Sequence, residues 1–140
     1  MKRRRRTEIL VQGNADLAEK LASQIKQAYT YKVIVKPHYG LTMVKMRESA
    51  KKSLFYIGEV LVTEAKVEIN EQIGIGIVQG MEDELAMNLA IIDAAYNANL
   101  PETQMWTNLL VVAEAEINRK KIKRQAELLE TKVNFETMEV

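Results

Sequence analysis

The sequence predicts a single α+β domain with two N-terminal helices, an antiparallel sheet of four or five strands, and two long C-terminal helices. Two changes of hydrophobic period predict this order. A helical spacing of apolar residues gives way to a period of two between Tyr31 and Val78, and the helical spacing returns after Gly80. No repeat or linker divides the chain, so we expect residues 1–140 to form one domain.

The composition argues against several kinds of site. The chain of 140 residues is 47% hydrophobic and 28% charged, which is ordinary for a globular protein. It contains no cysteine and one histidine, His38, so a disulfide, a thiolate nucleophile, a thiolate-bound iron–sulfur cluster or a histidine zinc site is not expected. No apolar run approaches the roughly 20 residues that span a bilayer, and the basic start has no signal-peptide core behind it. We therefore expect a cytoplasmic protein with no metal and no membrane contact.

Five consecutive cations, Lys2 to Arg6, form the strongest charge block of the sequence. We interpret residues 1–6 as a basic, solvated arm that need not be ordered, and contact with nucleic acid or phosphate is the alternative. The following residues, Thr7 to Gln12, suit a short helix that ends at Gly13.

A second helix is predicted from Asn14, a favourable N-cap residue, to Ala28. Its apolar side chains recur at helical spacing on one stripe, which we expect to face the core. The stripe consists of Leu17, Leu21, Ile25 and Ala28.

The period of two predicts the strands. Tyr31 to Lys36 is rich in β-branched and aromatic residues, and the next strand covers Leu41 to Arg47. The segment between them, Pro37 to Gly40, has the composition of a turn and should separate the two strands, with His38 exposed there rather than catalytic. A polar hairpin loop is predicted at Ser49 to Lys52.

A long strand, bent at Gly58, is predicted for Leu54 to Asn70. Its second half alternates, with Glu64, Lys66 and Glu68 on one face and mainly apolar residues on the other, so one face of the sheet should meet water. The second face carries Leu61, Thr63, Ala65, Val67 and Ile69.

After a turn at Glu71 and Gln72, the strand from Ile73 to Gly80 leads into a helix, an order that is similar to a phosphate-binding turn. The glycine spacing does not fit the dinucleotide fingerprint, the P-loop lysine is missing, and the carboxylates of Glu82 to Glu84 would repel a phosphate. We interpret Gly74 and Gly76 instead as positions where another backbone or a helix comes close.

The helix after Gly80 is apolar over most of its circumference and should pack on two sides, against the sheet and against another helix or a partner subunit. A stripe of Ala86, Ala90 and Ala94 would allow close approach. Asp93 is a carboxylate within this apolar stretch. We expect it to be hydrogen-bonded or ion-paired, and the alternative is a base or a metal ligand.

The last helix is predicted from Gln104 to about Lys132, after a break at Asn97 to Thr103. Its middle carries a second basic cluster, Arg119 to Arg124, which is flanked by glutamates at pairing distance. This arrangement is typical of a salt-bridged solvent face, and a surface for phosphate or an acidic partner is the alternative. Residues 133–140 alternate in polarity and predict an extended docking tail.

The order of these features resembles the PhnG family, the small G subunits of the bacterial carbon–phosphorus lyase core complex. The resemblance covers nearly the whole chain, and several motifs in the same order carry it. These are Phe55-x-x-Gly-Glu-Val, Val78-Gln-Gly80, Leu89-Ala-x-Ile-Asp-Ala94, Arg124-Gln-Ala-Glu127 and Val133-x-Phe-x-Thr-Met138.

The resemblance implies a role in the use of organic phosphonates. In that family the G, H, I and L proteins together make α-D-ribose 1-methylphosphonate 5-triphosphate, because methylphosphonate displaces adenine from ribose C1′ of MgATP. The resemblance implies an accessory or structural subunit of this transferase complex, with the nucleosidase chemistry in the I subunit and the later radical cleavage in the J subunit. The implied partners are the H, I and J subunits, with I the most direct, and the L protein in the reaction.

The family transfers no catalytic, cofactor-binding or metal-binding residue to this chain, and MgATP is implied as the substrate of the complex. Two or more copies are expected in the assembly, and a homodimer of the isolated chain is left open. Two other hypotheses remain. One is a nucleic-acid-binding module that uses Lys2 to Arg6 and Arg119 to Arg124. The other is a free-standing enzyme with Asp93 and His38 in its site.

Overall fold

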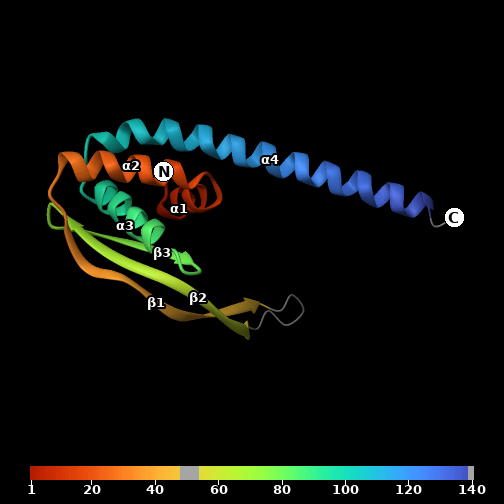
Figure 1. The fold of residues 1–140 in the computed structure, drawn as a ribbon, viewed down its shortest axis with the longest axis horizontal. Helices are drawn as coiled ribbons and strands as arrows, with labels where there is room; N and C mark the ends of the chain where they lie inside the picture. Colours follow the sequence, from red (N-terminus) through yellow and green to blue (C-terminus); the bar gives the residue numbers. More distant parts are fainter. Residues whose placement is uncertain (48–53, 139–140) are drawn as a thin grey trace.

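The computed structural model describes residues 1–47 and 54–138, which form four helices on one face of a three-stranded antiparallel sheet (Figure 1). The helices are α1 (Arg3–Gln12), α2 (Ala15–Ala28), α3 (Asp83–Asn97) and α4 (Glu102–Met138). The strands are β1 (Lys32–Arg47), β2 (Leu54–Ile69) and β3 (Gln72–Gln79), in the spatial order β1-β2-β3. α3 lies on the sheet, and the other helices cover α3 (Figure 1). The predicted α+β class and the order of the helices are confirmed.

Within the described residues the sheet has three strands rather than the predicted four or five, because β1 continues through Pro37 to Gly40. The register against β2 shifts between Val35 and His38, so the predicted turn is a bulge in one continuous strand. β1 is an edge strand, where a proline can be accommodated without loss of a ladder hydrogen bond. The predicted hairpin loop at Ser49 to Lys52 lies outside the described residues.

β2 carries the alternation that the sequence predicts. Its predicted inward residues are buried, except for Leu61, which is 37% exposed and pairs with Gly80 just after the end of β3. The buried ones are Thr63, Ala65, Val67 and Ile69. Another register shift lies next to Gly58, where a bend is predicted. β2 and β3 are joined through Asn70 and Glu71, whose φ angles of 49° and 66° are typical of a two-residue hairpin turn, one residue earlier than predicted.

Two glycines of β3 bring α3 into backbone contact with the sheet. A Cβ atom at Gly74 would overlap the backbone of Ala90 and Ala94, and a Cβ atom at Gly76 would overlap the carbonyl oxygen of Ala86. All three alanines are fully buried. The close approach that the sequence predicts for these glycines and alanines is therefore confirmed.

The other side of α3 packs against α2, which confirms the prediction of a helix that is covered on two sides. The members of the predicted α2 stripe that reach the core are Leu17, Leu21 and Ile25. Ala28 was predicted to face the core but is exposed, and the adjacent Tyr29 packs against the core at this end of α2. The predicted N-cap is confirmed, since the Asp16 N–H donates to Asn14 Oδ1 at 3.0 Å.

Trp106 holds the N-terminal part of α4 to the rest of the domain. We call this part, α1 to α3 with the sheet and the start of α4, the body. The fully buried Trp106 ring lies edge-on to Tyr96 with the ring centroids 5.9 Å apart, and its Nε1–H donates to Gln24 Oε1 at 2.8 Å. The Tyr29 hydroxyl donates to the carboxylate of Glu102 at 2.9 Å. These contacts join α4 to α2 and α3.

α4 continues as one helix of 37 residues to Met138. The predicted extended tail is therefore wrong for residues 133–138, whose backbone is helical. Extending an existing helix gains a hydrogen bond for each residue that is fixed, whereas an extended tail needs a partner strand. The C-terminal half of α4, blue in Figure 1, projects away from the other elements. Among the described residues, we find no helix with the length and apolar character needed to cross a membrane.

Candidate subunit-contact site

The arginine run forms the start of α1. Arg3 and Arg6 are three residues apart, so the helix places them on the same side, toward α3. Arg6 is buried, Arg3 and Arg5 are partly exposed, and the side chain of Arg4 is almost fully exposed. The run is therefore helical from Arg3 and is ion-paired at Arg3, Arg5 and Arg6, whereas Lys2 to Arg5 stay exposed as expected for an arm.

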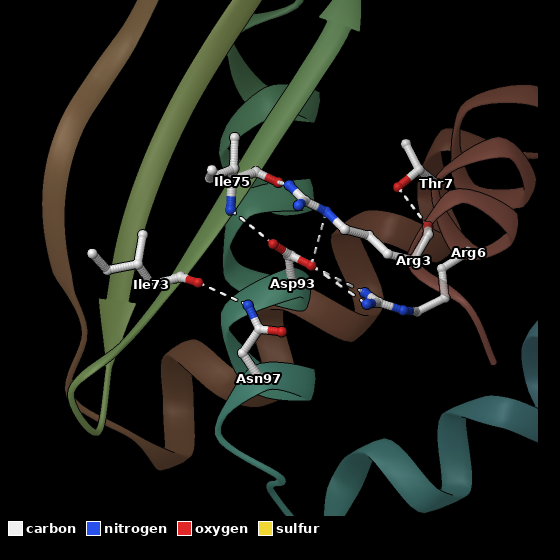
Figure 2. A network of polar contacts seen from close by, with 7 residues as sticks. All are labelled: Arg3, Arg6, Thr7, Ile73, Ile75, Asp93 and Asn97. Atoms are coloured by element: carbon white, nitrogen blue, oxygen red, sulfur yellow. Dashed lines mark hydrogen bonds and ion pairs between the residues drawn. The ribbon is translucent and has the colours of Figure 1, made fainter.

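The carboxylate of Asp93 in α3 forms ion pairs with two of these arginines (Figure 2). Its Oδ1 lies 3.4 Å from Arg3 Nε and 3.4 Å from Arg6 Nη2, and its Oδ2 accepts a hydrogen bond from the Ile75 N–H of β3 at 2.9 Å. The Asp93 side chain is 5% exposed. The prediction that Asp93 is ion-paired or hydrogen-bonded is confirmed, and this enclosure places the carboxylate out of reach of a dissolved substrate.

Arg6 is a cation within the core. Burial lowers the pKa of Arg6, and the negative charge of Asp93 opposes this shift. Because arginine remains protonated in proteins even when it is buried, the guanidinium stays charged at neutral pH. Its Cζ also lies 4.0 Å from the ring centroid of Tyr96, a cation–π arrangement. A carboxylate and an aromatic ring together compensate the buried charge.

A second pair joins α1 to α4. Arg5 donates to both carboxylate oxygens of Glu114, with distances of 2.8 Å from Nε and 2.5 Å from Nη2. These hydrogen bonds hold the pKa of Glu114 below its usual range and raise the pKa of Arg5. Sequence reasoning did not find this pair, since the two residues are 109 positions apart.

The outer edge of β3 lies beside this network. β3 pairs with β2 on one side, where the Gly80 N–H donates to the Leu61 carbonyl. Pairing alternates along an antiparallel strand, so every second residue points its N–H and C=O groups away from β2. These residues are Ile73, Ile75, Ile77 and Gln79.

Side chains of α1 and α3 cap the first half of that edge (Figure 2). Arg3 Nη2 donates to the Ile75 carbonyl at 3.4 Å, and Asn97 Nδ2 donates to the Ile73 carbonyl at 2.8 Å. With the Ile75 N–H bound to Asp93, the edge is blunted there against pairing with another strand.

A groove of about 450 Å³ lies between α1 and the second half of the edge. Val11 and Ile77 line it together with Arg3, Arg4 and Glu8. Both arginines already face carboxylates, so the groove has little free positive charge for a phosphate. An apolar groove along a strand edge suits an extended peptide segment better than a small anion.

The structure does not bring His38 and Asp93 together. His38 is exposed on β1, as predicted, with its Nδ1 3.2 Å from the Lys36 carbonyl oxygen. Asp93 binds the edge of β3, and β2 separates β3 from β1. The described part of the chain also contains no group of three side chains placed to hold a metal ion.

The second basic cluster lies on the projecting half of α4 and is exposed. Lys120 Nζ lies 3.8 Å from Glu116 Oε1, so the predicted salt-bridged face is observed for this pair. A binding surface for an acidic partner at Arg119 to Arg124 stays a prediction.

One protein-family model matches nearly the whole chain. A family model described as phosphonate metabolism protein PhnG matches residues 1–139. The match includes the arginine run, the β3–α3 contact and α4. The chain belongs to the PhnG family of phosphonate metabolism proteins.

Proposed function

We propose that the chain is a non-catalytic subunit of the carbon–phosphorus lyase core complex. In this complex methylphosphonate would displace adenine from ribose C1′ of MgATP to give α-D-ribose 1-methylphosphonate 5-triphosphate, and partner subunits would carry the chemistry. Family membership supports the coarser statement of a role in phosphonate metabolism. The subunit role rests on the surface of the molecule.

The observation that carries the proposal is the apolar surface that the described residues leave uncovered. Large apolar side chains that stay exposed on a strand or helix face are candidates for contact with another protein. Here large apolar side chains are more than half exposed on the sheet, after β3 and along α4. They are Leu41, Met43, Ile73, Met81, Met105, Val112, Ile122, Leu128 and Leu129. Contact with partner subunits would cover them.

The titratable side chains also support an accessory role. Displacement of a base from ribose needs a positioned oxyanion nucleophile, an activated leaving group and cations over the triphosphate. Asp93 is enclosed by Arg3 and Arg6, and His38 lies on the edge of the sheet opposite the groove. Neither residue is placed to act on a substrate with the other.

In this proposal the partners are the H, I and J subunits, with I in direct contact, and the L protein takes part in the reaction. MgATP would be bound by the complex rather than by this chain alone. The assembly would contain two or more copies of the chain and would act in the cytoplasm.

Co-expression with the H, I and J subunits, followed by size-exclusion chromatography, tests the proposal. We expect co-elution, and we expect triphosphate product from MgATP and methylphosphonate only when this chain is present with the others and the L protein. A chain that elutes alone while all partners stay in solution contradicts the proposal. His38→Ala should keep both assembly and activity, and loss of activity in an intact complex would contradict the non-catalytic role.

The alternative of a nucleic-acid-binding module relied on both clusters of cations, and the first cluster is now less available for phosphates. Arg3, Arg5 and Arg6 are ion-paired within the fold, which leaves mainly the α4 cluster for phosphates. Binding of a DNA or RNA duplex near physiological salt, with affinity that falls steeply as salt rises, would favour this alternative.

A further inference from the structure

The distal arm of α4, defined as residues 119–138, lies apart from the body (Figure 1). Every residue from Arg119 to Lys132 is exposed. Three large apolar side chains are among them: Ile122 is 67% exposed, and Leu128 and Leu129 are each 64% exposed. Most of the stability of helices in proteins comes from packing of one face, so a partner that covers one face would stabilise the arm.

Charge is segregated along the distal arm. Its first part carries five cations and no carboxylate, and its second part is mainly acidic. The cations are Arg119, Lys120, Lys121, Lys123 and Arg124, and the residues that follow up to Lys132 carry two glutamates, Glu127 and Glu130, and one cation, Lys132 itself. A parallel pair of such helices would place cations opposite cations. An antiparallel pair places the basic part of each helix opposite the acidic part of the other.

One face of the arm combines apolar and charged residues in a self-complementary order. Ile122 and Leu129 are seven residues apart and share a face with Ala126. Lys123 and Glu130 are also seven residues apart and flank this face on the same side. In an antiparallel pair centred between Gln125 and Ala126, Ile122 meets Leu129 of the other copy, and Lys123 lies within reach of its Glu130.

The body of the protein leaves this face open. α4 packs on the body through Trp106 and Leu110, which are fully buried. Leu128 follows Leu110 by five complete helical turns and therefore projects in the same direction as Leu110. Ile122 and Leu129 project on a different side, where Val111 continues the exposed face toward the body.

We infer that two copies of the chain associate through their distal arms as an antiparallel helix pair. The pair has two-fold symmetry, so each contact between Ile122 and Leu129 and each contact between Lys123 and Glu130 occurs twice. The interface is small, and we expect a dissociation constant on the order of 10 μM. This association involves the purified chain alone and does not depend on the proposed function.

Sedimentation velocity of the purified full chain tests the inference. We expect concentration-dependent dimers, and Lys123→Glu should weaken them about tenfold by placing like charges together twice. Adding Glu130→Lys should restore the affinity to within about threefold of the original. A monomer at all concentrations up to about 500 μM, or no recovery in the double variant, would overturn the inference.

Two neighbouring leucines provide a matched control, since they are equally exposed but lie on different sides of the arm. Leu129→Asn should weaken the dimer about tenfold, whereas Leu128→Asn should change it by less than about threefold. The opposite order would overturn the proposed face. Circular dichroism of each variant shows whether the helix content is retained.

The absence of cysteine from the chain allows the direction to be tested by cross-linking. Ala126→Cys places the thiols of the two copies beside the two-fold axis and should give a disulfide-linked dimer under mild oxidation. Arg119→Cys places the two thiols about 20 Å apart along the helix axis in an antiparallel pair. Efficient cross-linking of Arg119→Cys but not of Ala126→Cys would overturn the antiparallel arrangement.

Discussion

Arg6 and Asp93 connect three elements through one buried ion pair. Asp93 also binds the Ile75 N–H, so the pair holds α1, α3 and the edge of β3 in one arrangement. Removing one partner of such a pair leaves the other charge buried without compensation. Arg6 therefore acts inside the fold, although its neighbours in the run are exposed.

Asp93→Asn should lower the free energy of unfolding by about 3–5 kcal/mol, because Arg6 would remain charged and buried. Urea denaturation followed by circular dichroism measures this change. The control is Glu116→Gln, which removes an exposed pair with Lys120 and should change stability by less than about 1 kcal/mol. Equal losses for the two variants would contradict a structural role of the buried pair.

The pair of Arg5 and Glu114 should contribute a pH-dependent part of the stability. Arg5 holds the pKa of Glu114 below its usual value of 4.5, so the stabilisation is complete above that pH and is lost as the pH falls through the lowered pKa. The difference in unfolding free energy between the original chain and Glu114→Gln should therefore shrink between pH 7 and pH 3. Urea titrations across this range measure it, and a pH-independent difference would contradict the assignment.

At the residue scale, the sequence predicts the need for these contacts but not the partners. An acidic residue in the apolar helix around Asp93 predicts a hydrogen bond or a cation. The choice of Arg3 and Arg6 depends on the packing of α1 against α3, 87 positions away from Arg6. A block of five cations is typical of a solvated segment, and only the three-dimensional fold shows which side of it is buried.

At the scale of elements, the contact between β3 and α3 fixes the distance between the sheet and the helical layer. Gly74 and Gly76 allow the backbone of α3 to lie against the strand, and the buried alanines of α3 fill the space on the helix side. The close packing therefore depends on the lack of side chains at Gly74 and Gly76 as well as on the small side chains of the alanines in α3.

Gly76→Ala should destabilise the protein by at least about 2 kcal/mol, because the new methyl group overlaps the Ala86 carbonyl oxygen and α3 must move. Gly40→Ala is the matched control, since no atom lies within 4 Å of the new Cβ there. Its change should stay within about 1 kcal/mol. Thermal or urea unfolding followed by circular dichroism compares the two, and similar losses would contradict the close-approach explanation.

α2, α3 and β3 are predicted well because their periodic patterns are long and their ends carry clear signals. The number of strands is wrong because Pro37 and Gly40 are turn-forming residues that an edge strand accommodates as a bulge. The form of the C-terminal segment is wrong because alternation over a few residues does not distinguish a strand from the end of a long helix.

At the scale of the whole molecule, the body and the distal arm are separate in their energetics. The body contains the buried core, whereas residues 119–132 are exposed throughout. A substitution or a truncation in the distal arm should therefore leave the unfolding free energy of the body nearly unchanged.

A shortened chain that ends at Lys121 should keep the stability of the body, with a change in unfolding free energy below about 1 kcal/mol. The same chain should be monomeric, because it lacks Leu129 and Glu130. Circular dichroism melting and sedimentation velocity measure the two properties. Loss of the folded body would contradict the separation, and persistent dimers would contradict association through the arm.

The position of Trp106 has an optical consequence. It is the only tryptophan of the sequence, and its ring is fully buried between α4, α3 and α2. Its fluorescence emission should therefore shift to longer wavelength when the body unfolds and should stay unchanged when the arms separate or fray. A difference between the emission curve and the loss of far-ultraviolet helical signal would thus show, in a single sample and without a label, which part of the molecule melts first.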